Sequence, residues 1–233
     1  MKNKLRSTSK ITPVVATLLA SASVADAGLS DFQNEVNSGT PPVTTLFTTV
    51  SGSAPQLIDV GALTGDRSFE FIVNAGLGGA SSAFLGRQET NGRQGLKFEQ
   101  FGDTGVLGVT NFGVVDLNSD DAPPLFTDTH VFFASDGTDT NLYVNGTNVF
   151  TFAGFPLLGF GEQGIAAAYN GSSFFDVLDG NILGFASYDS ALSPAEIATH
   201  SNAFFVPEPS SFAIVALTSV GMLARRRRCD PFA

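Results

Sequence analysis

Short segments in which apolar and polar side chains alternate fill the middle of the chain. Ser68–Val73 places both of its phenylalanines and Val73 on one face, with Ser68 and Glu70 on the other, and Leu96–Glu99 alternates in the same way. A period of two over a few residues predicts β-strands with one face toward a core. Glu99 is then expected on a solvated strand face.

Turn signals separate these segments. Asn145-Gly146 lies between Asn141–Val144 and Thr147–Phe152, and its two residue types accept the positive φ angles of a tight hairpin turn. Val131–Ala134 and Ile182–Tyr188 add two further predicted strands. Strands at short intervals, without helical patterns between them, predict an all-β fold, an antiparallel β-sandwich.

One brief helix is expected after the last predicted strand. Ser193-Pro194-Ala195-Glu196 matches a capping box, in which Ser193 is the N-cap and Glu196 is the third helical residue. The helix is expected to run to about His200. It would close the domain before a linker.

The first 27 residues have the three parts of a secretory signal peptide. A basic stretch precedes an apolar run at residues 11–22, and Ala25 and Ala27 are the small residues expected before a cleavage site at Gly28. The alternative is a transmembrane anchor, but the apolar run is too short to span a bilayer comfortably. An exported protein that meets the export machinery is therefore predicted.

The C-terminal end shows a second ordered pattern. A proline-rich motif comes first: Val206, Pro207, Glu208 and Pro209. An apolar stretch at residues 211–224 is predicted to form a hydrophobic helix, short against the roughly 20 residues that cross a bilayer. A basic cluster follows, expected on the cytoplasmic side: Arg225, Arg226, Arg227 and Arg228.

This order resembles the PEP-CTERM sorting signal of bacterial exported proteins. The resemblance implies recognition by an exosortase-type membrane enzyme, which would cut near the motif. It also implies a protein that is transiently held in the membrane by its tail and reaches the cell surface or the medium. An ordinary C-terminal anchor is the alternative.

Removing both ends changes the charge of the protein. The whole chain has a net charge of −10, whereas residues 28–206 hold four basic and nineteen acidic side chains. Such a surface repels phosphate backbones, so nucleic acid is not expected as a partner. It suits neutral sugars, cationic partners or divalent cations. The one cysteine, Cys229, lies beyond the arginines, which excludes disulfides and thiolate chemistry in the middle.

Two stretches resemble LamG-like, concanavalin A-like jelly rolls. Thr129–Gly137 with Leu142–Gly146 is similar to their paired central strands, and Asp179–Ile197 to their closing strand and short helix. The family usually has an acidic, arginine-containing strand where this chain reads Leu183–Ala186. The implied division is a signal peptide at 1–27, an N-terminal extension with a first strand at 28–55, a jelly roll at 56–205 and a sorting tail at 206–233.

Catalytic patterns are weak. A glycosidase needs two carboxylates about 5–9 Å apart, and the alternating acidic motif of jelly-roll glucanases is absent. Tryptophan, a common stacking surface for sugars, is also absent. His130 and His200 have no nucleophile motif beside them and are interpreted as surface or edge histidines. The prediction is a protein without catalytic residues.

Calcium is the candidate small ligand, and no other cofactor is expected. Asp116–Asp120 opens like an EF-hand loop, but Asp121 and Thr127 stand where glycine and glutamate are required. Because LamG-like domains often hold Ca²⁺ at a loop rim, the resemblance points to two other clusters. Their members are Asp136, Asp139 and Asn141 in one, and Asp176 and Asp179 in the other. Turn formation explains the same residues and is the favoured interpretation.

Three functions fit these features. The first is a surface-sorted, non-catalytic recognition or adhesion module that binds glycan or another extracellular polymer. The second is a secreted carbohydrate-active enzyme, a glycoside hydrolase whose carboxylate pair is not apparent in the sequence. The third is a structural component of an extracellular matrix.

Overall fold

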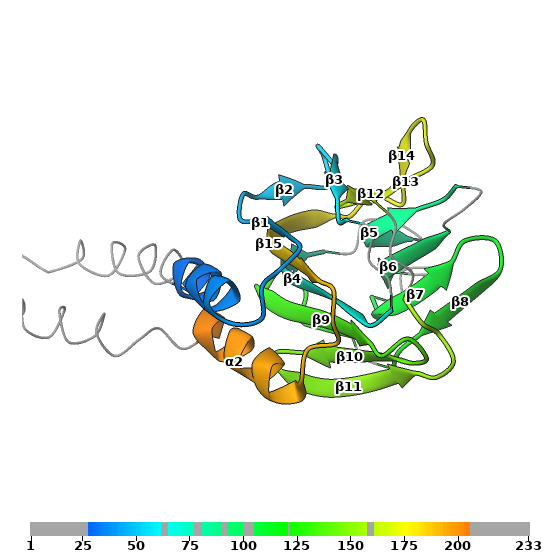
Figure 1. Ribbon diagram of the computed structural model, residues 1–233. Coiled ribbons are helices and arrows are strands. Elements are labelled where there is room, and N and C mark those ends of the chain that lie inside the picture. Colours follow the sequence, from blue (N-terminus) through cyan, green and yellow to red (C-terminus); the bar gives the residue numbers. More distant parts are fainter. Residues whose placement is uncertain are drawn as a thin grey trace, which may run out of the picture.

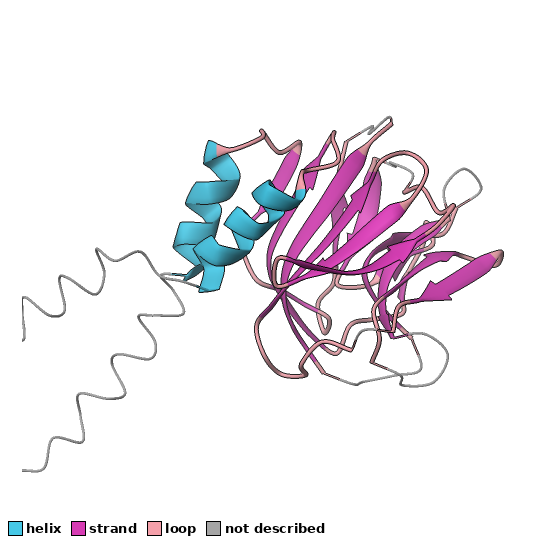
Figure 2. Ribbon diagram, turned by 90° about the horizontal axis from the view of Figure 1, so that it is seen from below, coloured by secondary structure: helices cyan, strands magenta, loops and turns pink. Residues whose placement is uncertain are grey.

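The computed structural model describes residues 28–61, 65–76, 81–89, 93–99, 105–120, 122–157 and 161–205. The signal peptide predicted at 1–27 and the tail predicted at 206–233, each with its expected helix, lie outside these residues. Within them, two β-sheets pack face to face and two helices cover one sheet (Figure 1, Figure 2). The predicted all-β sandwich is confirmed.

The first sheet has seven strands, all antiparallel to their neighbours. Its order is β1-β15-β4-β9-β10-β11, and β2 pairs with β15 at one end. The strands are β1 (Thr44–Leu46), β2 (Val50–Ser51), β4 (Arg67–Ala75), β9 (Thr129–Ser135), β10 (Thr140–Val144), β11 (Thr147–Phe152) and β15 (Gly180–Tyr188). The strands predicted from Ser68, Val131, Asn141, Thr147 and Ile182 onward all lie here.

The second sheet has eight strands in the order β14-β13-β5-β6-β7-β8, with β12 pairing β5 and β3. Its pairs are antiparallel except that of β13 with β5. The strands are β3 (Gln56–Asp59), β5 (Ser82–Arg87), β6 (Gln94–Glu99), β7 (Gly108–Asn111), β8 (Val115–Asn118), β12 (Glu162–Ile165), β13 (Ala168–Tyr169) and β14 (Phe174–Phe175). Side chains from the two sheets meet in a shared core.

Phenylalanine fills this core in place of tryptophan. The ring centroid of Phe71 lies 5.2 Å from that of Phe185 within the first sheet and 5.6 Å from that of Phe84 across the core. Phe84 in turn lies 5.9 Å from Phe98. All four rings are fully buried or nearly so, and contacts between tilted rings add to the free energy of burial.

The helical layer is larger than the sequence predicted. α2 (Pro194–Phe205) begins at the predicted capping box but continues past His200. A second helix, residues 28–38, precedes the first strand and was not predicted. Leu29, Phe32 and Val36 lie on one face of it because they are three and four residues apart. They pack on the outer face of the seven-stranded sheet with Ile197 of α2.

The two helices run antiparallel. A Cβ atom on Gly28 would lie 2.5 Å from the carbonyl oxygen of Phe204, and one on Gly39 would lie 3.6 Å from His200 Nε2. The beginning of one helix therefore lies at the end of the other. Phe32 and Phe204 make an edge-to-face contact between them.

The predicted hairpin turn between β10 and β11 is confirmed and also supports α2. Asn145 and Gly146 have φ angles of 49° and 78°. A Cβ atom on Gly146 would lie 3.1 Å from Ser201 Cβ and 3.3 Å from Ala198 Cα. Glycine at this position thus lets both the turn form and the helix approach.

We expect Gly146→Ala to lower the free energy of unfolding by about 2–3 kcal/mol, because it combines an unfavourable φ with a clash against α2. Gly154→Ala is the matched control, since Gly154 has a φ of 69° but nothing within 4 Å of the added Cβ. The control should lose about 1 kcal/mol. Urea denaturation of both variants measures the difference, and equal losses would show that the turn does not support the helix.

Candidate functional site

Each sheet carries one buried charged residue on its outer face. Glu70 in β4 lies between Phe69 and Phe71, and Lys97 in β6 lies between Leu96 and Phe98; the four apolar neighbours point into the core between the sheets. Because side chains alternate along a strand, Glu70 and Lys97 point outward, in opposite directions. The helices cover Glu70, while Lys97 borders open space.

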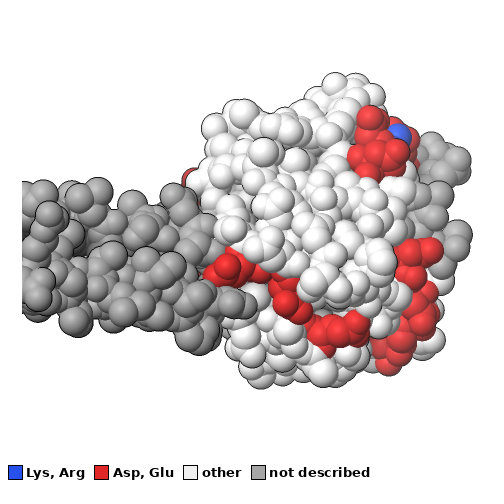
Figure 3. Space-filling model, turned by 60° about the vertical axis from the view of Figure 1, so that its left-hand side comes forward, with Lys and Arg blue, Asp and Glu red and all other residues white. Residues whose placement is uncertain are grey.

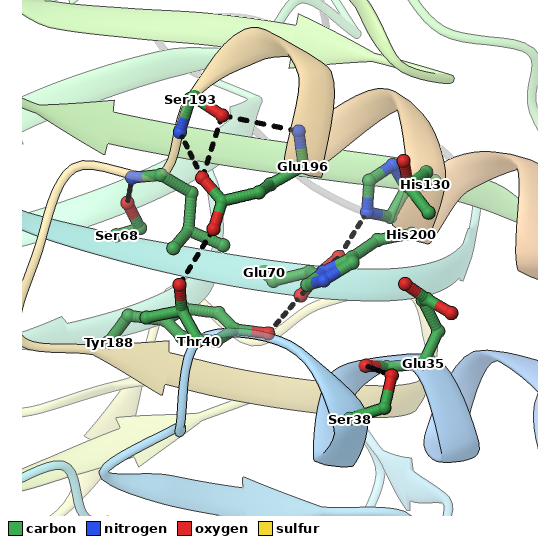
Figure 4. A network of polar contacts seen from close by, with 12 residues as sticks. Glu35, Ser38, Thr40, Ser68, Glu70, His130, Tyr188, Ser193, Glu196 and His200 are labelled. Atoms are coloured by element: carbon green, nitrogen blue, oxygen red, sulfur yellow. Dashed lines mark hydrogen bonds and ion pairs between the residues drawn. The ribbon is translucent and has the colours of Figure 1, made fainter.

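Glu70 is the centre of a fully buried group of polar side chains (Figure 4). His130 Nε2 in β9 donates a hydrogen bond to Glu70 Oε1 at 2.6 Å, and the Tyr188 hydroxyl in β15 donates to Oε2 at 2.6 Å. His200 Nδ1 in α2 lies 3.1 Å from both oxygens. We call these four residues the Glu70 cluster.

The protonation of the Glu70 cluster follows from its contacts. Burial alone would raise the pKa of Glu70, but hydrogen bonds and charge from His130 and His200 outweigh burial and bring this pKa to about 2. Burial would lower the pKa of His200, yet hydrogen bonding to Glu70 and the charges of Glu70, Glu35 and Glu196 raise it above its ordinary value. Burial and the Glu70 carboxylate raise the pKa of Tyr188, so its hydroxyl stays a donor.

The two histidines were wrongly predicted to lie at the surface. His130 is 0% exposed and His200 is 2% exposed. Their partner Glu70 is 60 residues from one and 130 from the other along the chain, so no local pattern could reveal the pairing. The Glu70 cluster holds α2 on the sheet and is closed to a ligand.

A second group of contacts fixes the start of α2. Ser193 Oγ accepts from the Glu196 backbone N–H at 3.3 Å, and the Ser193 N–H donates to Glu196 Oε2 at 2.9 Å. Thr40 Oγ1 donates to Glu196 Oε1 at 2.7 Å, which ties the chain after the N-terminal helix to α2 (Figure 4). The predicted capping box is confirmed.

The outer face of the eight-stranded sheet has an open hollow of about 400 Å³. We call it the outer hollow. Its lining residues come from β6, β7, the turn between β7 and β8, β8 and the segment after β14, with one residue before β5: Ser81, Lys97, Thr110, Phe112, Gly113, Asp116 and Asp176. These residue types offer an ammonium group, two carboxylates, hydroxyls and an aromatic ring to one ligand.

Lys97 is the buried charge of the outer hollow. Its side chain is 3% exposed and forms an ion pair with Asp176, which is 24% exposed. Burial lowers the pKa of Lys97, and Asp176 and Asp116 oppose that effect. The Lys97 ammonium also lies 5.5 Å from the centroid of the Phe112 ring, within the range of a cation–π interaction.

Thr110 gives the outer hollow an unsatisfied polar atom. The residue is 0% exposed, and its Oγ1 has no hydrogen-bond partner. A buried hydroxyl without a partner costs free energy in the empty protein. Thr110 is also one of the residues that line the outer hollow.

The residues predicted to bind calcium make other contacts in the structure. Asp136 Oδ1 accepts from the backbone N–H groups of Thr138 and Asp139, so it forms the β9–β10 turn. These backbone hydrogen bonds lower the pKa of Asp136.

The other predicted ligands also have structural contacts or lie elsewhere. Asp139 Oδ1 accepts from the Gly154 N–H, and Asn141 Oδ1 from Thr151 Oγ1. Asp176 belongs to the outer hollow, and the exposed Asp179 lies three residues further on. Among the described residues, no three His, Cys, Asp or Glu side chains are grouped to hold a metal ion, and the calcium site stays a prediction.

Acidic side chains dominate the charged surface. They form separate groups on the face drawn in Figure 3, with little basic surface between them. Two of the four basic residues of the middle region, Arg67 and Lys97, are buried, which makes the exposed surface still more acidic. Across the described part of the chain, no helix is both long and apolar enough to cross a membrane.

Family models match two parts of the chain. Residues 47–198 match the concanavalin A-like lectin/glucanases superfamily, and residues 205–228 match the PEP-CTERM protein-sorting motif. Both resemblances predicted from the sequence are thus confirmed. The sorting motif indicates an exported, surface-sorted protein. No curated protein matches the chain in sequence.

Solved structures share the fold at low identity. The CBM40 of the Ruminococcus gnavus IT-sialidase, bound to α2,3 sialyllactose, has a TM-score of 0.54 and 15% identity over 69% of this chain and 99% of that one. Domain 4 of AbnA, a GH43 extracellular arabinanase from Geobacillus stearothermophilus, in complex with arabinotriose, has a TM-score of 0.52 and 16% identity over 66% and 75%.

A longer protein also contains this fold. The NanB sialidase, in a structure with Optactamide, gives a TM-score of 0.51 and 14% identity over 68% of this chain, but the match spans 28% of the sialidase chain. At these identities the likeness establishes the sandwich fold alone.

We expect the Glu70 cluster to make stability depend on pH in two directions. The contribution of Glu70, whose pKa is lowered from 4.5 to about 2, is present above pH 4.5 and lost as the pH falls toward 2. The contribution of His200, whose pKa is raised from 6.5, is present below pH 6.5 and lost as the pH rises through the raised value. Stability should therefore be highest between these limits.

Glu70→Gln tests this assignment. It should lower the free energy of unfolding by about 2–4 kcal/mol at pH 5.5 and flatten its pH dependence, because a buried pair loses one partner. Glu162→Gln, at an exposed position in β12, is the control and should leave both unchanged. Urea denaturation from pH 3 to 9 provides the measurement, and an unchanged pH profile in Glu70→Gln would refute the assignment.

Proposed function

The chain belongs to the concanavalin A-like lectin/glucanases superfamily, and we propose that it is an exported recognition module that binds glycan in the outer hollow without cutting it. The observation that carries this proposal is the Lys97–Asp176 ion pair, which lines an open hollow of about 400 Å³ together with Asp116. Polar side chains around an open space favour a ligand that is rich in hydroxyl groups.

The chemistry of the outer hollow fits a sugar in two respects. Lys97 donates hydrogen bonds, Asp116 and Asp176 accept them, and Thr110 can do either. Phe112 lies under the ammonium group, and its ring contacts that of Phe175 with centroids 5.3 Å apart. Aromatic rings offer an apolar surface for the C–H face of a sugar.

Charge favours a neutral glycan over an acidic one. Asp116 and Asp176 together outweigh the charge of Lys97, and Lys97 is already paired with Asp176. The middle region of the chain also has far more acidic than basic side chains. A ligand carboxylate or sulfate would therefore meet repulsion in this site.

The relatives support glycan recognition by this fold. One was solved with arabinotriose and another with α2,3 sialyllactose. The two structures contain different sugars, which is consistent with a fold in which local side chains determine the ligand.

The proposed localisation of the protein follows from its sorting tail. We propose that an exosortase-type enzyme recognises the Pro207–Pro209 motif and that the arginine cluster at 225–228 stays on the cytoplasmic side until cleavage. The hydrophobic stretch at 211–224 would then hold the protein in the membrane only transiently. The mature protein acts at the cell surface or outside the cell.

One observation favours the alternative of a carbohydrate-active enzyme. Asp116 and Asp176 line the same hollow, and a glycosidase uses two carboxyl groups that flank one sugar bond. Against this, Asp176 is the ion-pair partner of Lys97, an arrangement that suits a binding carboxylate and not a proton donor. Recognition without cleavage therefore fits the site better.

We expect the purified protein to bind neutral polysaccharides on a glycan array and Lys97→Met to weaken that binding roughly ten- to hundredfold. The methionine keeps the length of the side chain but removes the donor and the ion pair. Arg87→Met is the matched control, because Arg87 also forms an ion pair on this sheet, with Glu89, outside the outer hollow. If the wild type binds no glycan on the array, the proposed function is wrong.

The same polysaccharides separate binding from catalysis. Incubation with the wild type should release no new reducing ends, and Asp116→Asn should change affinity without changing this result. Reducing-sugar assays over a day give the measurement. Release that depends on Asp116 would establish the enzyme alternative.

A further inference from the structure

Unusual backbone conformations gather at one edge of the sandwich. Among the described residues, four residues other than glycine have a positive φ: Phe126, Asn145, Ala166 and Asp176. The hairpin turn explains Asn145. The other three surround the segment 176–179, because Asp176 begins it, Ala166 accepts the Leu178 N–H at 3.0 Å, and Phe126 lies beside Asp179 across Gly76.

Phe126 is the most unusual of these residues. Its φ is 54° and its side chain is 72% exposed. The Phe126 N–H donates to the Ala75 carbonyl at 2.8 Å, which fixes the backbone at the end of β4. A bulky residue in the left-handed region is rare, and strain of this kind gathers at functional sites.

The folded state gains little from this ring. An exposed aromatic side chain contributes little burial, while the left-handed backbone is unfavourable for any residue with a Cβ atom. Glycine would therefore give the same turn with less strain. Stability does not explain why phenylalanine occupies this position.

Gly76 makes room for the Phe126 ring. A Cβ atom on Gly76 would lie 2.5 Å from Phe126 Cε1 and 3.0 Å from Asp179 Oδ2. The ring and the exposed Asp179 carboxylate thus lie side by side above the glycine. Nearby, Asn74 Nδ2 donates to Asp128 Oδ1 at 2.7 Å, which adds further polar atoms around the ring.

The segment 176–179 connects this ring to the outer hollow. Asp176 lines the outer hollow, and Asp179 lies beside Phe126. Val177, between them, is 44% exposed. A ligand that leaves the outer hollow along this segment reaches an apolar ring with a carboxylate next to it.

We propose that Phe126 and Asp179 form a second subsite, in which the ring stacks on the apolar face of a sugar unit and the carboxylate accepts from its hydroxyls. The ligand is then an oligosaccharide chain of neutral sugars and not one terminal sugar. This inference rests on the proposed glycan binding in the outer hollow and adds the length and direction of the ligand.

The test uses length ladders of arabino-, gluco-, xylo-, manno- and galacto-oligosaccharides, from two to six units, titrated into the full mature chain by calorimetry. In each series that the wild type binds, its affinity should rise with the number of sugar units. Phe126→Gly should lose roughly three- to tenfold in affinity for the longest members and leave the disaccharide unchanged. Phe126→Tyr should keep the length dependence, because it keeps the ring.

Stability measurements separate the subsite from a structural role. The thermal midpoint of Phe126→Gly should equal or exceed that of the wild type, since glycine relieves the backbone. Gly76→Ala, which displaces the ring by its methyl group, should lose the same length dependence. Val43→Ala removes another exposed apolar side chain, directly before β1, and should change nothing.

The possible failures are distinct. If the wild type binds none of the five ladders, the proposed function fails and the second subsite with it. If the wild type binds but Phe126→Gly keeps the length dependence, the second subsite alone is refuted. A lower thermal midpoint with equal loss for all lengths would make Phe126 a structural residue and would also refute it.

Discussion

The buried carboxylate of Glu70 is the constraint on which the layered structure depends. A charge at the middle of the central strand β4 must find partners, because an unpaired buried carboxylate would cost several kcal/mol. The neighbouring strands β9 and β15 supply His130 and Tyr188, and α2 supplies His200. The helix must therefore lie over this part of the sheet. The N-terminal helix then closes the same layer through Phe32 and Phe204.

Lys97 also points outward because side chains alternate along its strand, but its surroundings differ from those of Glu70. Like Glu70, it lies between two core residues and points away from the core. Neither of the two described helices covers it, and its ion-pair partner Asp176 remains partly exposed. The two sheets thus have similar sequence patterns but different outer faces. One face is sealed by apolar packing, and the other keeps polar groups available beside the outer hollow.

The strands could be predicted because their signals are local. Alternation around Glu70 and Lys97, and the Asn145-Gly146 turn, need only a few neighbouring residues. The helix at 28–38 also had a local signal, the three- and four-residue spacing of Leu29, Phe32 and Val36, but it does not begin with a capping box like that of α2. The Glu70 cluster had none, because its other three members lie 60 to 130 residues from Glu70 along the chain.

The candidate site was predictable only in its residue types. Asp176 was singled out as a calcium ligand, but its partner is Lys97, 79 residues away. Phe126 gave no signal in the sequence, since its importance lies in a positive φ and in the space left by Gly76. The acidic composition of the middle region remains the basis for expecting neutral sugars, cationic partners or divalent cations as ligands. A surface with few exposed cations suits neutral sugars. In the outer hollow, too, acidic side chains outnumber basic ones.

The two ends of the described part of the chain lie on the sealed face. Gly28 contacts Phe204, so the first described residue and the last turn of α2 lie together in the helical layer. The sorting motif follows directly after α2, whose place is set by His200 on Glu70. The outer hollow lies on the opposite side of both sheets. The described part of the chain therefore begins and ends on the sealed face, on the side of the domain opposite the outer hollow.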